Sequence, residues 1–388
     1  MALRLYNTGS MRKEQFRTLA TGKVTVYVCG VTPYDTTHLG HAFTYLSFDT
    51  LIRYLKFKGF KVTYTQNVTD IDDDILRKAK EQGRNWRELG QYWTDRYLRD
   101  MDNLNVAMPD HYAKATESIP EIIKIVSALL KRKYAYVSNG NVYFDVSRFP
   151  RYGQLSHFSG KQMKILLKER GGDPDDLNKR NPLDFILWQR WKKNEPSWDA
   201  PFGKGRPGWH IECSAMINQY LGDKIDIHGG GRDLVFPHHE SEIAQSESYT
   251  GKRPFAGYFM HTGTVMYMGE KMAKSLGNLV MVSDLLKKHS PNVIRWLILS
   301  HHYRKVWEYL DEDIDHAGRC ARLVDKVMRQ RPGNGKVNKR LVSRFEQIMD
   351  DDIDTPAALE FINSLLDKGK ETGTARYLLG VLGFSGRR

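Results

Sequence analysis

Apolar residues in the first third of the chain alternate between strand-like and helix-like patterns. Residues 24–28 are apolar and β-branched, which predicts a buried strand, and Gly30 and Pro33 then break it into a turn. From 42 to 54 the apolar positions recur at helical spacing, and 61–68 read as a second strand. Further amphipathic helices are expected at 83–104 and 119–133. This alternation predicts an α/β fold.

The pattern changes after this region. A hairpin-type turn at Asn139-Gly140 and irregular loops indicate an insertion between two halves of one α/β fold, and the second half resumes near Gly208. From 283 onward the pattern is helical. We therefore predict four segments: a first half of the α/β domain at 1–137, a connective insertion at 138–204, a second half of the α/β domain at 205–282 and a C-terminal helical domain at 283–388.

Composition narrows the class of protein. The 388 residues include 59 Lys+Arg and 46 Asp+Glu, a formal charge of +13 that slightly favours a polyanionic partner such as RNA. No apolar stretch is long enough to span a bilayer, and no signal-like segment is present. Three cysteines form an odd, sparse set typical of a reducing compartment. We expect a cytoplasmic protein with no membrane partner.

Two short stretches could contact phosphate groups. His38 and His41 lie where the first helix is predicted to begin, and a helix N-terminus is a natural seat for phosphate. Residues 270–278 form a basic, glycine-ended loop that carries Lys271 and Lys274. Taken alone, each stretch is more often an ordinary surface feature.

Four other residues have the side chains that zinc prefers. Cys29, Cys213, His238 and Glu242 offer two thiolates, an imidazole and a carboxylate, and the last two are spaced i, i+4. Their spacing matches no compact zinc-binding pattern, so two buried structural cysteines and a helix-face pair are the alternative. The four aspartates within 70–74 could bind a cation, but a capped helix start is favoured.

Together, these stretches resemble a known family. The early His-Leu-Gly-His and the late Lys-Met-Ala-Lys-Ser resemble the paired signatures of class I aminoacyl-tRNA synthetases. Residues 208–216 and 236–246 resemble the cysteine-specific members, and the resemblance extends from 24 to 303. It implies a split Rossmann-type catalytic domain with an inserted connective subdomain and a C-terminal helical bundle. It also implies a zinc ion that binds the substrate cysteine, and Mg²⁺ with ATP.

The resemblance also implies roles for individual residues. The catalytic set is His38, His41, Lys271 and Lys274. The ATP-binding set adds Gly40, Gly229, Gly230, Gly231 and Asp233. The cysteine-binding set is Cys29, Thr32, Thr69 and Trp209, and the metal ligands are Cys29, Cys213, His238 and Glu242. Cys320 is expected to be a packing residue.

Two relatives with different acceptors fit this pattern. Residues 30–42, 169–174 and 201–207, and the end of the chain at 388, resemble the ligases that join cysteine to an amino sugar in mycothiol synthesis. Glu242 and the positive charge favour cysteinyl-tRNA synthetases. A catalytically inactive paralogue is the third alternative. We predict a monomer that uses ATP, L-cysteine and an amine acceptor, with tRNA as the alternative acceptor.

Overall fold

A five-stranded parallel sheet forms the centre of the protein. The structure is a computed structural model that describes all residues except 1, 36, 273–275, 330–336, 370 and 387–388. The strand order is β11-β10-β3-β4-β5, and every neighbouring pair is parallel. The strands are β3 (Lys23–Val31), β4 (Lys61–Val68), β5 (His111–Lys114), β10 (Ile225–Gly231) and β11 (Ala256–Thr262). The chain order reverses between β3 and β10, and in such sheets ligands bind outside the carboxyl ends of the strands at this point.

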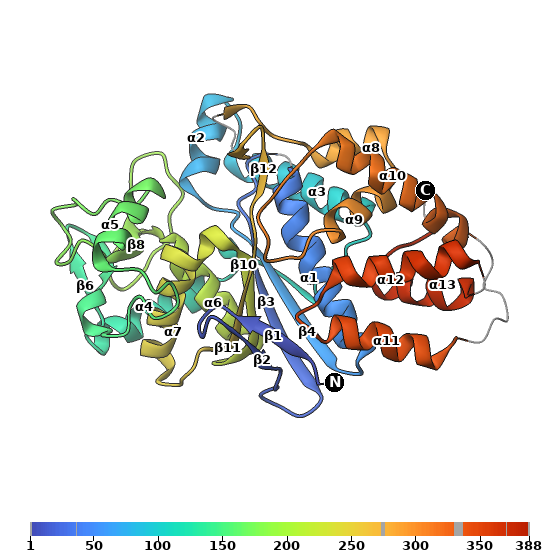
Figure 1. The fold of residues 1–388 in the computed structure, drawn as a ribbon. Helices are drawn as coiled ribbons and strands as arrows, with labels where there is room; N and C mark the ends of the chain where they lie inside the picture. Colours follow the sequence, from blue (N-terminus) through green and yellow to red (C-terminus); the bar gives the residue numbers. More distant parts are fainter. Residues whose placement is uncertain (1, 36, 273–275, 330–336, 370, 387–388) are drawn as a thin grey trace.

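Helices cover both faces of the sheet. Val26 of β3 belongs to the hydrophobic core shared with α1 and the C-terminal helices, whereas Tyr27 belongs to the core shared with α4, α6 and α7. Figure 1 shows α1 on one side of the β3–β10 pair and α6 on the other. The helices are α1 (Leu39–Phe57), α2 (Asp73–Glu81), α3 (Trp86–Asn103), α4 (Ile119–Lys131), α6 (Trp209–Leu221) and α7 (Glu240–Thr250). The predicted α/β fold is therefore confirmed.

Polar caps set where two of these helices begin. His38 is the N-cap of α1, and its side chain accepts a hydrogen bond from the Gly40 N–H. The helix thus starts before residue 42, where the apolar pattern had placed it. Asp72 caps α2 by accepting from the Asp74 N–H. The aspartates therefore include a helix cap, as the sequence predicted.

A second sheet is antiparallel and lies beside the first. Its order is β6-β7-β8-β9, and Asn139 and Gly140, both with positive φ, form the turn between the first two strands. Its strands are β6 (Ala135–Ser138), β7 (Asn141–Phe144), β8 (Phe185–Arg190) and β9 (Gly205–Pro207), with α5 (Gly160–Glu169) between β7 and β8. This sheet begins and ends slightly outside 138–204, and the division into domains stays a prediction.

The C-terminal part is mainly helical and packs beside α1 (Figure 1). Its helices are α8 (Val282–Lys288), α9 (Pro291–Leu299), α10 (Asp311–Arg329), α11 (Lys339–Met349), α12 (Thr355–Lys368) and α13 (Thr372–Val381). The short strand β14 (Trp307–Glu308) interrupts them and pairs with β12 (Val265–Tyr267), which also pairs with β13 (Glu270–Lys271). The expectation of helix alone after 283 was wrong here.

A few short elements complete the fold. A hairpin of β1 (Arg4–Asn7) and β2 (Arg12–Gln15) forms near the N-terminus, where no strand was predicted. Short helical turns occupy η1 (Ala115–Glu117), η2 (Val146–Arg148), η3 (Arg232–Leu234) and η4 (Val235–His239). Among the described helices, none has both the length and the apolar character needed to cross a membrane.

Candidate active site

The four predicted metal ligands meet in one buried cluster. Cys29 lies near the carboxyl end of β3, and its Sγ is 3.9 Å from Cys213 Sγ on α6 and 3.6 Å from Glu242 Oε1 on α7. His238 Nε2 lies 3.1 Å from the same Glu242 oxygen. One donor atom from each of the four lies within 4.8 Å of the others. Residues more than 200 positions apart in sequence thus form a compact donor set.

Further histidines surround this cluster, and sequence reasoning had given them no role. His239 Nε2 is 3.3 Å from Cys29 Sγ, and His228 Nε2 is 3.0 Å from Glu242 Oε2. With Cys29 and Glu242 they make a second, overlapping donor set. Each is a direct sequence neighbour of a residue already singled out, which was the signal available.

Burial controls the protonation of these groups. Burial, together with a hydrogen bond to Cys213, raises the pKa of the Cys29 thiol well above its usual value. Burial lowers the pKa of His238 to about 3, so its imidazole is neutral near pH 7. Neutral imidazole is the form that binds a metal, and a nearby dication would favour the thiolate. Two thiols, an imidazole and a carboxyl in a buried space therefore fit a zinc ion.

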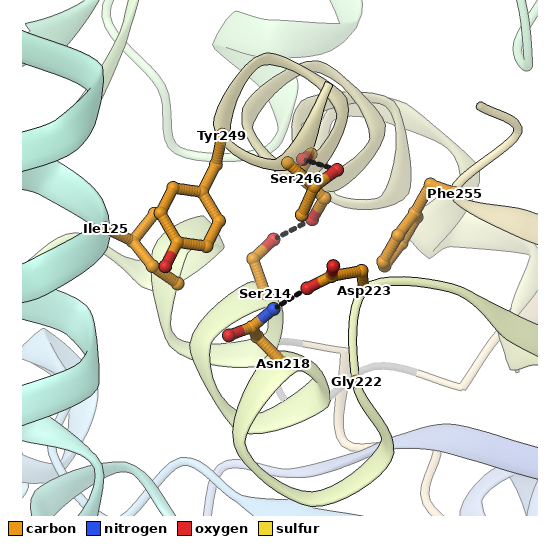
Figure 2. A pocket seen from close by; sticks show the side chains of 9 residues that line it. Ile125, Ser214, Asn218, Gly222, Asp223, Ser246, Tyr249 and Phe255 are labelled. Carbon is orange, nitrogen blue, oxygen red and sulfur yellow. Dashed lines mark hydrogen bonds between the residues drawn. The ribbon is translucent and has the colours of Figure 1, made fainter. Parts of the chain in front are cut away.

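Hydrogen bonds between α6 and α7 hold the cluster together. Gln245 Nε2 donates to Ser214 Oγ at 2.7 Å, and Ser246 Oγ donates to the same oxygen at 3.0 Å. Figure 2 shows the Ser246–Ser214 bond across a small pocket at one end of these helices, with Asn218 bonded to Asp223 below it. Because Ser214 follows Cys213, this contact sets the position of α6 relative to Glu242.

Backbone hydrogen bonds join the early signature to the segment that follows the late signature. The Leu39 N–H donates to the Val280 carbonyl at 2.8 Å, and the Val282 N–H donates to the Thr37 carbonyl at 3.0 Å. These bonds place the start of α1 beside residues 280–282, just after the loop at 270–278. Lys274 lies outside the described residues.

The two histidines of the early signature stack on each other. The ring centroids of His38 and His41 are 3.8 Å apart. Burial and then the positive charge of Lys271 lower the pKa of His38 to about 4, and burial and then His38 lower that of His41 to about 3. Near pH 7 both rings are therefore neutral and can each donate one hydrogen bond.

The other predicted ATP contacts lie nearby. Lys271 Nζ is 3.0 Å from Asp233 Oδ2, in an exposed ion pair. A Cβ at Gly229 would lie 2.3 Å from the Phe48 ring, and one at Gly230 would lie 2.9 Å from Leu234. Packing against these side chains therefore already requires the first two glycines, before any ligand binds.

The predicted cysteine-binding residues lie at the carboxyl edge of the sheet. Trp209 is 38% exposed and stacks on His238 with ring centroids 4.4 Å apart. Thr69 follows β4, is buried, and its N–H donates to the Val31 carbonyl at 3.1 Å. Thr32 is half-buried in the turn after β3. These roles stay predictions. Cys320, in α10, packs against the helical core, as expected for a packing residue.

Comparison with known proteins identifies the family. Residues 15–319 match the family model described as tRNA synthetases class I (C) catalytic domain. The protein named cysteine–tRNA ligase from Legionella pneumophila (strain Paris) is 45% identical, over 98% of this chain and 85% of the relative. The chain belongs to the cysteinyl-tRNA synthetase family. A second member of this family, from Thermococcus onnurineus (strain NA1), is also 45% identical, over 93% of this chain and 79% of the relative.

Solved structures support the fold of this family. Mycobacterium tuberculosis methionyl-tRNA synthetase in complex with methionyl-adenylate aligns with a TM-score of 0.62 at 16% identity, covering 93% of this chain and 89% of the other. A leucyl-tRNA synthetase in a ternary complex from Agrobacterium radiobacter K84 aligns with a TM-score of 0.65 at 11% identity, covering 95% and 84%. Both show the class I fold.

Membership of the cysteinyl-tRNA synthetase family settles the kind of enzyme. The chain is an ATP-dependent, cysteine-activating ligase of the aminoacyl-tRNA synthetase type. The relatives are named for ligation to tRNA, so they favour the alternative acceptor over the predicted amine, which they do not support. The amine had been inferred from three short stretches and from where the chain stops, and neither outweighs identity along nearly the whole chain.

Proposed function

We propose that this protein forms cysteinyl-adenylate from L-cysteine and ATP and transfers the cysteinyl group to tRNA. The observation that carries the proposal is the buried Cys29–Cys213–His238–Glu242 donor set, together with the hydrogen bonds that join the start of α1 to the segment after the late signature. The relatives named cysteine–tRNA ligase support tRNA as the acceptor.

The buried donor set is proposed to hold one zinc ion beside the substrate's side chain. Cys29, Cys213, His238 and Glu242 are the residues that would bind it. Zinc bound there would lower the pKa of a substrate thiol and bind sulfur far better than the hydroxyl of serine. Trp209, stacked on His238, would form one wall of the cysteine pocket, and Thr69 would form another.

The signature residues are proposed to act on ATP, bound with Mg²⁺. The carboxylate of cysteine attacks the α-phosphorus, and pyrophosphate leaves. The neutral rings of His38 and His41 donate hydrogen bonds to the phosphoryl oxygens as their charge grows. Lys271, with Lys274, contributes positive charge, while Asp233 accepts from the ribose hydroxyls. A ribose hydroxyl at the 3′ end of tRNA then attacks the carbonyl carbon, and AMP leaves.

Two assays on the same preparation test this function. We expect cysteine-dependent exchange between ATP and pyrophosphate, with serine giving almost none, and cysteinyl-tRNA formed from cognate tRNA. Lys271→Ala should lower the exchange rate by about 100-fold, because a charge contact made at the transition state is worth that much. The matched control is Lys287→Ala, since Lys287 is an exposed lysine on α8 that pairs only with Asp284 among the described residues. Exchange without tRNA charging, together with transfer to an amino sugar, would favour the amine-acceptor alternative.

A further inference from the structure

One buried arginine connects the insertion to the first half of the catalytic fold. Arg206, in β9, is only 3% exposed. Its Nε donates to Glu195 Oε2 at 3.2 Å, in the loop between β8 and β9, and its Nη2 donates to Asp73 Oδ1 at the start of α2. A single guanidinium thus binds two carboxylates that are more than 120 residues apart in sequence.

Both ends of this bridge lie next to a proposed wall of the cysteine pocket. Only Pro207 and Gly208 separate Arg206 from Trp209. On the other side, Asp73 is the first residue of α2, and Thr69 stands just before that helix. The Arg206–Asp73 pair therefore connects the segment that carries Trp209 to the turn that carries Thr69.

The strand that carries Arg206 leaves little room for independent movement. The Gly208 N–H donates to the Leu187 carbonyl at 3.0 Å, and a Cβ at Gly208 would lie 2.1 Å from the Ile186 carbonyl oxygen. β9 is thus held tightly against β8 up to the first residue of α6. A shift at Arg206 would be passed directly to Trp209.

We propose that Arg206 is a positioning residue that sets the separation of Trp209 and Thr69, and so the affinity for cysteine. This rests on the proposed function, because the pocket between these two residues is part of it. The planar guanidinium suits the task, since its donors point in fixed, different directions and can reach two carboxylates together. Glu195 and Asp73 share this one cation, so removing it would leave both carboxylates without it.

Four variants separate this role from a general effect on folding. Arg206→Ala should raise the KM for cysteine in the exchange assay by about 10-fold or more, with a smaller change in kcat, since displacement by about 1 Å can be this costly. Asp73→Asn, on the 66% exposed side chain of the partner, should raise KM less and carries little risk to folding. Arg206→Lys should recover part of the effect because one carboxylate can still be bound. Arg190→Ala is the control, since Arg190 is an exposed arginine of the same hairpin that bonds only to Asn139 through its side chain among the described residues.

Amide hydrogen exchange gives a readout that does not depend on activity. If Arg206 positions both walls, Arg206→Ala and Asp73→Asn will speed exchange in the segments 68–76 and 205–212, and Arg190→Ala will not. Unchanged protection in 68–76, or an unchanged KM for cysteine despite a lowered Tm, would overturn the proposal. Should the wild-type protein show no cysteine-dependent exchange of pyrophosphate, the proposed function fails, while hydrogen exchange still decides whether Arg206 joins the two segments.

Discussion

The thiol of Cys213 shows how strongly the buried cluster constrains single residues. It lies 3.9 Å from the Cys29 thiol, and both cysteines are almost fully buried with Glu242 and His238. A buried carboxyl group without a charged partner is costly, and the proposed zinc ion would supply that partner. A change at any one donor should therefore affect metal binding and substrate binding together.

Cys213→Ser should lower zinc affinity by at least about 10-fold, because a hydroxyl is a poor zinc ligand, and cysteine affinity should fall with it. Metal analysis after dialysis against a chelator, and the KM for cysteine in pyrophosphate exchange, measure the two effects. The matched control is Cys320→Ala, which removes a half-buried packing thiol on α10 and should leave zinc content unchanged. Full zinc occupancy in the Cys213→Ser protein would contradict this assignment.

The lowered pKa of His41 predicts a dependence of stability on pH. Burial, followed by the neighbouring His38, lowers the pKa of His41 from 6.5 to about 3. Below pH 6.5 the unfolded chain therefore binds a proton that the folded protein does not, and the free energy of unfolding falls as pH falls, by about 1.4 kcal/mol per pH unit for such a group. His41→Asn should flatten the curve by about this slope between pH 5.5 and 4.5 in urea titrations.

The pH range above 7.5 serves as the control for His41 in the same urea titrations. Above pH 7.5 the imidazole is neutral in both states, so the curves for wild type and His41→Asn should run parallel there. Parallel curves below pH 6 as well would show that His41 is protonated in the folded protein, contrary to the structure.

At the scale of residues, the sequence predicted the site best where a family motif and the ligand preference of zinc pointed to the same positions. Cys29, Cys213, His238 and Glu242 were brought together by family resemblance and zinc chemistry, and the structure places them within one small space. The sequence analysis gave no role to the three other histidines near this set, His228, His239 and His261. His261 contacts His239 because β11 pairs with β10, with Gly230 opposite His261, and such pairing cannot be read from spacing along the chain.

At the scale of elements, the strongly periodic helices were predictable, and those that lack an exposed face were not. α3 and α4 fall within or near the predicted ranges because each has one apolar stripe. By contrast, every residue of α7 from Glu240 to Ser248 is buried, including the polar ones. The pattern of polar and apolar residues therefore could not show which side of this helix faces the core. Glu240 Oε2 accepts hydrogen bonds from the N–H groups of Leu155 and Ser156, which come from the insertion.

The N-terminal hairpin was missed for a similar reason. Its strands have four residues each and are largely polar, so they carry no clear alternation. The hairpin is held by contacts with β11: the Thr8 N–H donates to the Phe259 carbonyl at 2.8 Å, and Asn7 Oδ1 accepts from the Phe259 N–H at 3.1 Å. Partners 250 residues away decide its structure.

The hydrogen bonds between α6 and α7 at the pocket in Figure 2 are expected to stabilise the protein. Ser214→Ala removes the acceptor shared by Gln245 and Ser246. The buried Ser246 hydroxyl then loses its acceptor, while the Gln245 amide keeps its bond to the His210 carbonyl, so the free energy of unfolding should fall by about 1–3 kcal/mol in urea titrations. Ser248→Ala is the control, since the buried hydroxyl of Ser248 has no hydrogen-bond partner among the described residues and its removal should cost almost nothing. Equal losses in both variants would argue against the contact as the source of stability.

At the scale of the whole molecule, the order of the strands in the central sheet brings segments that are distant in sequence into one site. β3 and β10 are neighbours at the point where the chain order reverses, so Cys29 and Gly229–Gly231 share one edge although they are at least 200 positions apart in sequence. The predicted Rossmann-type arrangement already required these two segments to lie side by side. The identity of the acceptor did not follow from it, because the adenylate chemistry is common to both alternatives and no described side chain distinguishes an amine from a ribose hydroxyl.

The excess of positive charge predicts how the two half-reactions respond to salt. With 59 Lys+Arg against 46 Asp+Glu, tRNA should be held largely through its phosphates, and such contacts weaken steeply as counterions compete. Raising salt from 50 to 200 mM should therefore raise the KM for tRNA by at least about 10-fold, whereas the KM for cysteine, a small zwitterion, should change little. Both constants can be measured in one series, by charging of cognate tRNA and by pyrophosphate exchange. For a neutral or singly charged amine acceptor, the KM would hardly change with salt concentration. Equal salt dependence of the two half-reactions would therefore favour the amine acceptor over tRNA.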